Sequence, residues 1–321
     1  MISISDIHQA AERLAGVAVR TPLLESPRLN DLVGGRILLK AEIFQNTGSF
    51  KFRGAYNRIS RLSADERARG IIAFSSGNHA QGVARAAQMV GTSATILMPA
   101  DAPKSKVEGT RSYGAEVVHY DRYTEDREEI GGEIASSRNL LLVPPFDDPH
   151  IIAGQGTCGL EITQQARALG ASIDQLFVCA GGGGLTSGCA IAMNDEMPDA
   201  KVYAVEPKGY DDITLSLEKG EVVSVDPSQL SIADALLPPR PGKLTWPLMK
   251  RYVTGGLVVS DEEICKAVAY AFHSLKLQVE PGGAAALAAV LAHKIDVKDK
   301  TTAVTLSGGN MDIQTFIEIV S

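Results

Sequence analysis

Lys51 lies between two phenylalanines in the segment Ser49-Phe50-Lys51-Phe52-Arg53-Gly54. Aromatic and small neighbours can desolvate an amine, which lowers its pKa and makes the neutral, nucleophilic form accessible. Such a lysine could form a covalent bond with a carbonyl compound. Taken alone, the segment is more often a turn with an exposed lysine.

Four consecutive glycines follow the apolar run at 175–179 and precede a helical pattern: Gly181, Gly182, Gly183 and Gly184. Several unhindered backbone N–H groups would then lie at the positive end of a helix, where a phosphate can bind. The spacing differs from that of NAD- and ATP-binding glycine loops. The alternative is a tight strand-to-helix turn that binds nothing.

Short hydroxyl and amide side chains follow a second apolar run, in the segment Ser75-Ser76-Gly77-Asn78-His79. Free N–H groups and hydroxyls at a helix N-terminus suit a carboxylate or another oxygen anion. Ser76 or Asn78 could instead be an ordinary helix N-cap.

The fold that positions these segments is indicated by a regular alternation of strand-like and helical patterns along the chain. Strands are expected at 71–74, 94–98, 116–119, 140–143, 175–179, 201–205 and 302–306, and helices at 78–89, 104–113, 125–136, 156–167, 185–194, 261–275 and 282–293. This order predicts an α/β fold with mostly parallel sheets flanked by helices. The stretch at 220–247, rich in proline and glycine, is expected to be a surface loop around the site.

The composition favours a small-molecule partner. The 321 residues carry a net charge of −7, which argues against a nucleic-acid or membrane partner. The cysteines lack the spacing of a metal site or a disulfide framework; they are Cys158, Cys179, Cys189 and Cys265. Because no signal peptide or spanning helix is visible, a cytoplasmic location is expected.

Four segments together resemble one family. The lysine segment, Ser75-Ser76-Gly77-Asn78-His79-Ala80-Gln81-Gly82, the glycine loop and Leu306-Ser307-Gly308-Gly309-Asn310 occur in the order and at the separations found in threonine/serine dehydratases and serine racemases. These are fold-type II enzymes that depend on pyridoxal 5′-phosphate, with a fold like that of the tryptophan synthase β chain. The resemblance covers nearly the whole chain.

The resemblance implies roles for the coenzyme-binding residues. Lys51 would bind the coenzyme as a Schiff base and later act as the base at Cα, with Phe50 against the ring. The four glycines and Leu185 would hold the phosphate, and Asn78 the 3-oxygen of the ring. Ser307 would face the pyridine nitrogen, where a hydroxyl in place of a carboxylate favours β-elimination over transamination.

The resemblance also places the substrate and its reaction. Ser75, Ser76, Gly77, Asn78 and His79 would surround the substrate carboxylate. Ser76 matches the serine that, in racemases, faces Cα from the side opposite the lysine, so racemisation stays possible. The expected activity is an ammonia-lyase that converts L-threonine and L-serine into 2-oxobutanoate and pyruvate. The alternatives are serine racemase and 3-hydroxyaspartate ammonia-lyase.

A divalent cation is expected beside the coenzyme. Glu206, Asp212 and the carbonyl of Tyr210 offer hard oxygen ligands that suit Mg²⁺, Mn²⁺ or Ca²⁺. The segment resembles the structural metal site of serine racemases and some dehydratases. The alternative is an acidic surface loop.

Two further residues can each be interpreted in two ways. Glu280 matches a family glutamate near the ring, but it could also be a helix-start carboxylate. Arg127 could bind a second substrate carboxylate, as in relatives that act on 3-hydroxyaspartate, or it could lie on a solvated helix face.

The resemblance predicts two domains and an assembly of identical subunits. Residues 1–50 and 146–321 would form a large coenzyme-binding domain, and residues 51–145 a small, mobile domain that closes over the substrate. The chain ends soon after Ser307, so the regulatory domain of some threonine dehydratases is not expected.

Overall fold

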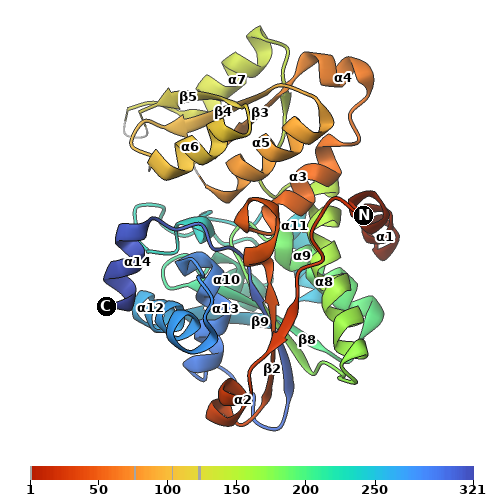
Figure 1. Ribbon diagram of the computed structural model, residues 1–321, viewed down its shortest axis with the longest axis vertical. Coiled ribbons are helices and arrows are strands. Elements are labelled where there is room, and N and C mark those ends of the chain that lie inside the picture. Colours follow the sequence, from red (N-terminus) through yellow and green to blue (C-terminus); the bar gives the residue numbers. More distant parts are fainter. Residues whose placement is uncertain (1, 76, 103, 122–123) are drawn as a thin grey trace.

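The protein has two lobes, each built around one sheet (Figure 1). The computed structural model describes residues 2–75, 77–102, 104–121 and 124–321. We call the part around the six-stranded sheet the large lobe and the part around the four-stranded sheet the small lobe. The α/β architecture with mostly parallel sheets, predicted from the sequence, is confirmed.

The sheet of the large lobe has the strand order β1-β2-β10-β7-β8-β9. Its strands are β1 (Leu23–Glu25), β2 (Arg36–Ala41), β7 (Gln175–Cys179), β8 (Lys201–Pro207), β9 (Gly255–Val259) and β10 (Thr301–Leu306). Only β1 pairs in an antiparallel direction, with β2. The carboxyl ends of β7, β8 and β10 therefore meet at one edge, where ligands of parallel sheets usually bind.

The sheet of the small lobe is parallel throughout, with the order β5-β4-β3-β6. Its strands are β3 (Ile71–Phe74), β4 (Ala94–Pro99), β5 (Glu116–Tyr120) and β6 (Leu141–Leu142). All of them fall inside the segment expected to form the small domain. The exact domain boundaries, and the mobility of that domain, stay predictions.

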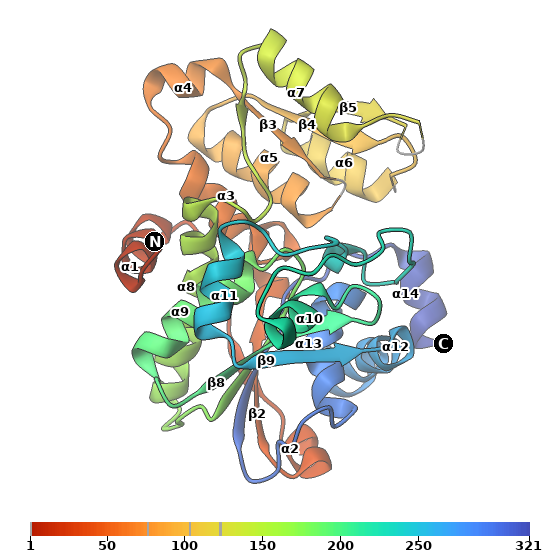
Figure 2. The ribbon, with the colours of Figure 1, turned by 180° about the vertical axis from the view of Figure 1, so that it is seen from behind.

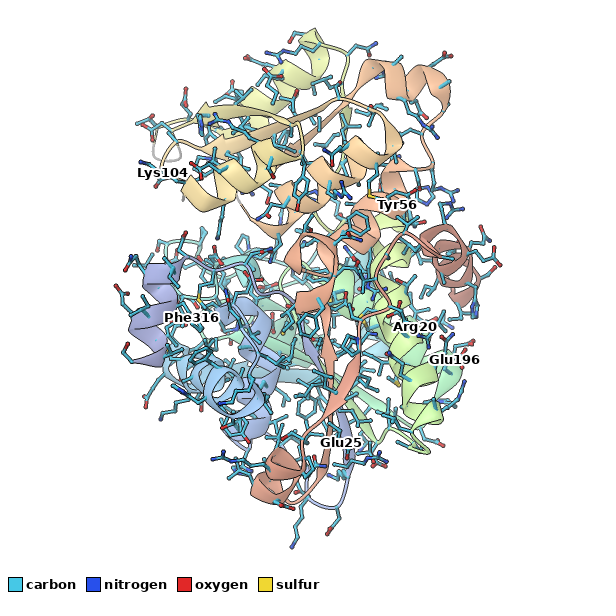
Figure 3. All side chains as sticks on the ribbon, in the orientation of Figure 1. Arg20, Glu25, Tyr56, Lys104, Glu196 and Phe316 are labelled. Atoms are coloured by element: carbon cyan, nitrogen blue, oxygen red, sulfur yellow. The ribbon has the colours of Figure 1, made fainter. Side chains whose placement is uncertain are left out.

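Helices cover both sheets, as Figures 1 and 2 show from opposite sides. The small lobe carries α4 (Ala64–Arg69), α5 (Asn78–Val90), α6 (Lys104–Ser112) and α7 (Arg127–Ser137). The large lobe carries α1 (Ile4–Leu14), α2 (Pro27–Val33), α8 (Pro149–Ala168), α9 (Gly184–Glu196), α10 (Asp212–Lys219), α11 (Thr245–Tyr252), α12 (Asp261–Tyr270), α13 (Pro281–Leu291) and α14 (Ile313–Val320). Helix α3 (Lys51–Ile59) lies where the lobes meet, and Tyr56 marks it in Figure 3.

Helix α8 begins seven residues earlier than the predicted start at 156. The Asp148 side chain accepts hydrogen bonds from the N–H groups of His150 and Ile151, and Pro149 occupies the first helical position. Both residues are typical helix-start signals. They place the start of the helix before the position that was predicted from the sequence.

The long connection at 220–247 is less irregular than predicted. It contains the short 3₁₀ helix η3 (Asp234–Leu236), and α11 begins inside it. The helix expected at 261–275 ends as α12 at Tyr270 and continues as a π-helical turn, Ala271–Leu275.

Buried apolar side chains explain why the elements hold together. Helix α13 consists almost entirely of buried alanine, glycine, leucine and valine, and it packs inside the large lobe. A helix that is apolar on all sides is stable only when it is surrounded by protein. In the described ranges of the chain, none of the helices combines the length and the apolar character needed to cross a bilayer.

Candidate active site

Lys51 begins helix α3, which lies where the two lobes meet (Figure 1). The Nζ atom donates a hydrogen bond of 2.9 Å to the carbonyl oxygen of Pro145 and lies 5.3 Å from the centre of the Phe50 ring. Burial lowers the pKa of this amine to about 8. Near neutral pH, a larger fraction of this amine is therefore neutral and nucleophilic than of a solvated lysine.

The end of β10 lies beside this lysine. The N–H of Phe50 donates to the carbonyl oxygen of Ser307 at 3.0 Å, and Ser49 pairs with Gly308. Ser307 is buried. Two of the predicted segments, far apart in the sequence, are thus joined through their backbones.

The four glycines connect β7 to α9 at the same edge of the large sheet. Gly183 has a φ angle of 89°, which L-residues with a side chain rarely adopt. A Cβ atom at Gly182 would lie 2.4 Å from the ring of Phe146. Glycine is required at both positions, by backbone conformation at one and by close packing at the other.

The backbone N–H groups of this turn are unpaired donors. Among the described residues, no acceptor takes the backbone N–H groups of the turn and the helix start, which are those of Gly181, Gly182, Gly183, Gly184 and Leu185. The buried hydroxyl of Thr186 likewise finds no partner in the described ranges. A helix N-terminus with free N–H groups stabilises an anion. The turn therefore fits a phosphate group.

The short segment Pro145-Phe146 contacts both Lys51 and the glycine turn. Pro145 accepts the hydrogen bond of Lys51, and the next residue, Phe146, packs on Gly182. Thr245 covers the other side, since its hydroxyl donates to the carbonyl oxygen of Gly182 at 2.7 Å. The amine, the phosphate-sized turn and the end of β10 thus form one site.

Asn78 connects the start of α5 to the large lobe. Its Nδ2 donates to Oε1 of Glu280 at 2.5 Å, and its Oδ1 accepts from Nδ2 of Asn310 at 2.7 Å. Burial raises the pKa of Glu280 to about 8. Glu280 is the N-cap residue of α13 by position, but its side chain does not cap the helix and instead binds Asn78. Glu280 thus stands at a helix start by position, and its role near the coenzyme ring stays a prediction.

His79 is neutral in this site. Burial, together with the nearby positive charge of Lys51, lowers the pKa of its ring to about 3. Its Nε2 lies 3.0 Å from the carbonyl oxygen of Val143, which can only accept a hydrogen bond. Nε2 therefore carries the proton, and the buried Nδ1 is left as an acceptor. The ring cannot donate to a carboxylate, whereas the backbone N–H in the first turn of α5 can.

Ser75 lies at the mouth of a cavity of about 510 Å³ between the lobes. Its hydroxyl accepts a hydrogen bond from the N–H of Gly77. Arg127 and Tyr120 of the small lobe and Leu237 of the large lobe line the same cavity. Ser76, predicted as a catalytic and substrate-binding residue, lies outside the described residues.

Two buried carboxylates lie near each other, Glu206 in β8 and Asp212 at the start of α10. Glu206 accepts hydrogen bonds from the N–H groups of Ile213 and Thr214 and from the Thr214 hydroxyl. Both oxygens of Asp212 are buried and have no partner among the described residues. Burial raises the pKa of Glu206 to about 7, and burial together with Glu206 raises that of Asp212 to about 8.

This pair is not the exposed acidic loop of the alternative interpretation. Glu206, Tyr210 and Asp212 are all buried. The Tyr210 hydroxyl donates to the carbonyl oxygens of Pro227 and Gln229, which fixes the loop and its backbone. Two unpaired carboxylate oxygens in a buried site call for a cation or a proton.

Sequence reasoning missed several residues that shape the site. Pro145 and Phe146 belong to no motif, so the sequence does not show that Pro145 binds Lys51 or that Phe146 packs on Gly182. Asn310 was part of a recognised segment but received no role. Its bonds to Asn78 and to the carbonyl oxygen of Thr47 show that it connects the two lobes.

Comparisons with known proteins agree with this geometry. L-threo-3-hydroxyaspartate ammonia-lyase of Pseudomonas sp is 42% identical over 318 residues, covering 99% of this chain and 98% of the relative. Serine racemase of Schizosaccharomyces pombe is 41% identical, covering 98% and 96%. The crystal structure of T.th. threonine deaminase superposes with a TM-score of 0.91 at 43% identity, covering 97% of this chain and 99% of that structure.

The family model described as pyridoxal-phosphate dependent enzyme matches residues 15–308. The resemblance predicted from the four segments is thereby confirmed. The free N–H groups of the glycine turn and the buried amine of Lys51 fit the phosphate and the aldehyde of that coenzyme. The chain belongs to the family of pyridoxal-phosphate dependent enzymes.

Proposed function

We propose that this protein is an ammonia-lyase that eliminates water from L-threonine and L-serine and releases a 2-oxo acid and ammonia. The observation that carries the proposal is the buried amine of Lys51. It binds Pro145, whose neighbour Phe146 packs on the glycine turn, and it follows Phe50, which binds Ser307 at the end of β10. When bound, pyridoxal phosphate withdraws electrons from Cα of an amino acid. Lys51 supplies the amine that holds the coenzyme and the base that removes the Cα proton.

The other coenzyme contacts follow from the same arrangement. Gly181, Gly182, Gly183, Gly184 and Leu185 bind the phosphate through their N–H groups, and Phe50 lies against the ring. Asn78 is oriented by Glu280 and Asn310 and hydrogen-bonds the 3-oxygen.

Ser307 decides the outcome of the reaction. A hydroxyl next to the pyridine nitrogen leaves that nitrogen largely neutral, so less negative charge is drawn into the ring than with a carboxylate partner. Loss of the β-hydroxyl is then faster than transfer of the amino group. This electronic argument favours a lyase over a transaminase.

The substrate carboxylate binds at the start of α5. Ser75, Ser76 and Gly77 precede this helix, and Asn78 and His79 form its first turn. The N–H groups at a helix N-terminus favour a negative charge. Since the His79 ring is neutral and donates to Val143, His79 contributes through its backbone, and its side chain shapes the pocket.

A substrate panel tests this proposal. The purified protein is loaded with pyridoxal phosphate and incubated with L-threonine, L-serine and both diastereomers of 3-hydroxyaspartate, and 2-oxo acids and ammonia are measured. We expect equal amounts of both products from threonine or serine, and none with Lys51→Ala. Absence of 2-oxo acid from every substrate would refute the lyase proposal.

A second candidate is 3-hydroxyaspartate ammonia-lyase. The cavity next to Ser75 is lined by Arg127, whose guanidinium could bind a second carboxylate in a bidentate manner. In the same panel, a preference for a 3-hydroxyaspartate diastereomer that is lost in Arg127→Met would favour this candidate. Chiral chromatography of serine recovered from the incubation distinguishes serine racemase, which would need Ser76 as the second acid–base group.

We also propose a divalent cation, Mg²⁺, Mn²⁺ or Ca²⁺, held by Glu206, Asp212 and the carbonyl oxygen of Tyr210. The support is the pair of buried, unpartnered oxygens of Asp212 beside a second buried carboxylate. Hard oxygen ligands of this kind suit these cations. An assembly of identical subunits is a further proposal, which light scattering of the purified protein tests.

A further inference from the structure

Three buried charged residues, Lys40, Glu42 and Arg53, and the partly buried Glu161 lie together next to Lys51. The guanidinium of Arg53 is fully buried and binds Glu42 through two hydrogen bonds, Nε to Oε2 at 2.7 Å and Nη2 to Oε1 at 2.8 Å. It also binds Glu161, from Nη1 at 2.7 Å and from Nη2 at 2.9 Å. Paired, planar hydrogen bonds of this type fix direction as well as distance.

Lys40 completes the group. Its Nζ donates to Oε2 of Glu161 at 2.6 Å, to the carbonyl oxygen of Thr21 at 2.7 Å and to Oε1 of Gln165 at 2.8 Å. We call Lys40, Glu42, Arg53 and Glu161 the buried charge cluster. Its positive and negative charges balance, and every donor of the ammonium group has a partner.

The charges are held in their ionised forms. Burial alone would raise the pKa of Glu42, but Arg53 and Lys40 together lower it. Burial likewise opposes the charge on Arg53, whereas Glu42 and Glu161 raise its pKa well above the usual value. Well-packed apolar side chains often stabilise a core as well as a buried ion pair does, so stability alone is a weak reason for such a cluster.

The cluster connects the first turn of α3 to two elements of the large lobe. Arg53 comes two residues after Lys51, Glu42 follows β2, and Glu161 lies on α8. The same turn touches α8 through its backbone, because a Cβ at Gly154 would lie 2.7 Å from the carbonyl oxygen of Arg53. On the other side of Lys51, the N–H of Phe50 binds Ser307.

We infer that Arg53 is the positioning residue of Lys51. The buried charge cluster holds the first turn of α3 on α8 and on the end of β2, so that the Lys51 amine keeps its place between Pro145 and the glycine turn. This inference rests on the proposed function of Lys51 as the coenzyme-binding residue. A displacement of about 1 Å at a catalytic group can lower a rate by about 100-fold.

Two double variants separate positioning from stability. Arg53→Met with Glu42→Gln removes the anchor of α3 and leaves Lys40 paired with Glu161. The matched control, Lys40→Met with Gln165→Leu, removes the buried ammonium group and its amide partner. It preserves all four bonds from Arg53 to Glu42 and Glu161.

Each protein is loaded with pyridoxal phosphate and compared in three measurements. These are the pH midpoint of the visible absorbance of the lysine-bound coenzyme, the thermal midpoint Tm, and kcat and KM for the best substrate. We expect the Arg53 double variant to show a shifted absorbance midpoint and a kcat lower by about tenfold to 100-fold. The control should lose a similar amount of Tm but keep its absorbance midpoint and its kcat within about twofold.

Equal effects of the two double variants on absorbance and kcat, or an effect of both on Tm alone, would overturn the inference. Arg53→Lys is the conservative variant if the first double variant does not fold, because it keeps the charge and loses the planar pair of bonds. It should shift the absorbance midpoint in the same direction, and an unchanged midpoint would refute positioning. A wild-type protein without lysine-bound coenzyme after borohydride reduction and mass analysis of Lys51 would instead refute the proposed function itself.

Discussion

Asn78 donates a hydrogen bond of 2.5 Å to the buried carboxyl of Glu280, although 202 positions separate them in the chain. Asn78 begins α5 of the small lobe, and Glu280 precedes α13 of the large lobe. Asn310 holds the other end of the Asn78 amide. The two lobes are therefore connected by hydrogen bonds at the proposed coenzyme site itself.

Replacing Glu280 by glutamine should make stability less sensitive to pH. Burial raises the pKa of Glu280 to about 8 in the folded protein, whereas an unfolded glutamate titrates at about 4.3. Protonation of Glu280 therefore stabilises the folded protein. This stabilisation is complete below the pKa of the unfolded glutamate, about 4.3, and is lost as the pH rises through about 8. Since glutamine does not titrate, the Tm of Glu280→Gln relative to wild type should increase between about pH 5 and about pH 8.

Thermal unfolding of both proteins across this range measures the difference. Glu262→Gln, which changes an exposed carboxylate, serves as the control and should show a constant difference from wild type. A constant difference for Glu280→Gln as well would mean that Glu280 is already ionised at the lower pH.

An ion pair between the lobes should affect substrate binding. Lys106 of α6 donates to Asp234 of η3 at 2.5 Å, and the Lys106 side chain is only 12% exposed. η3 packs on the glycine turn, because a Cβ at Gly181 would touch Leu236. Partly exposed ion pairs contribute up to about 1 kcal/mol, so Lys106→Met should raise KM by up to about fivefold and leave kcat nearly unchanged.

Varying the ionic strength gives a second test of the ion pair between Lys106 and Asp234. The KM of the wild type should rise with ionic strength, and the KM of Lys106→Met should respond less. Lys266→Met, which removes an exposed pair within α12, is the control. A KM that stays the same in Lys106→Met at low salt would show that the pair does not contribute to closing the site.

Local patterns were sufficient for seven of the parallel strands, although not for β2 and β9, and for the segments proposed to bind the coenzyme. Strands such as β3 and β7 contain continuous apolar runs because both faces are covered, and such runs are visible in a sequence. The glycine turn could be recognised because consecutive glycines have few structural uses. Joint recognition of four segments then identified the family, which no single segment could do.

Contacts between distant segments could not be predicted in the same way. The bond from Lys51 to Pro145 and the packing of Phe146 on Gly182 depend on how the lobes meet. Neither Pro145 nor Phe146 belongs to a recognised segment. Arg53 stands in a recognised segment, yet its partners Glu42 and Glu161 come from other elements. The sequence alone therefore does not show which buried charges neutralise one another in the folded chain.

Coenzyme capture should follow the titration of Lys51. Burial lowers the pKa of this amine to about 8, and only its neutral form attacks the aldehyde. The rate at which coenzyme-free protein gains its visible absorbance should therefore rise with pH up to about 8 and level off above it. Lys51→Ala should show no such absorbance, and a rate that still rises toward about pH 10 would indicate an ordinary, solvated lysine.

Divalent cations should stabilise the wild type through Asp212. Both of its oxygens are buried without a partner in the described part of the chain, so a bound cation would remove the cost of an unpaired charge. A ligand at about 100 times its Kd adds about 2.7 kcal/mol to the free energy of unfolding. We expect Mg²⁺ or Mn²⁺ to raise the Tm of the wild type by several degrees and a chelator to reverse it. Asp212→Asn should abolish the response, whereas Asp199→Asn, an exposed carboxylate elsewhere on the large lobe, should retain it. An equal response in both variants would place cation binding at some other site.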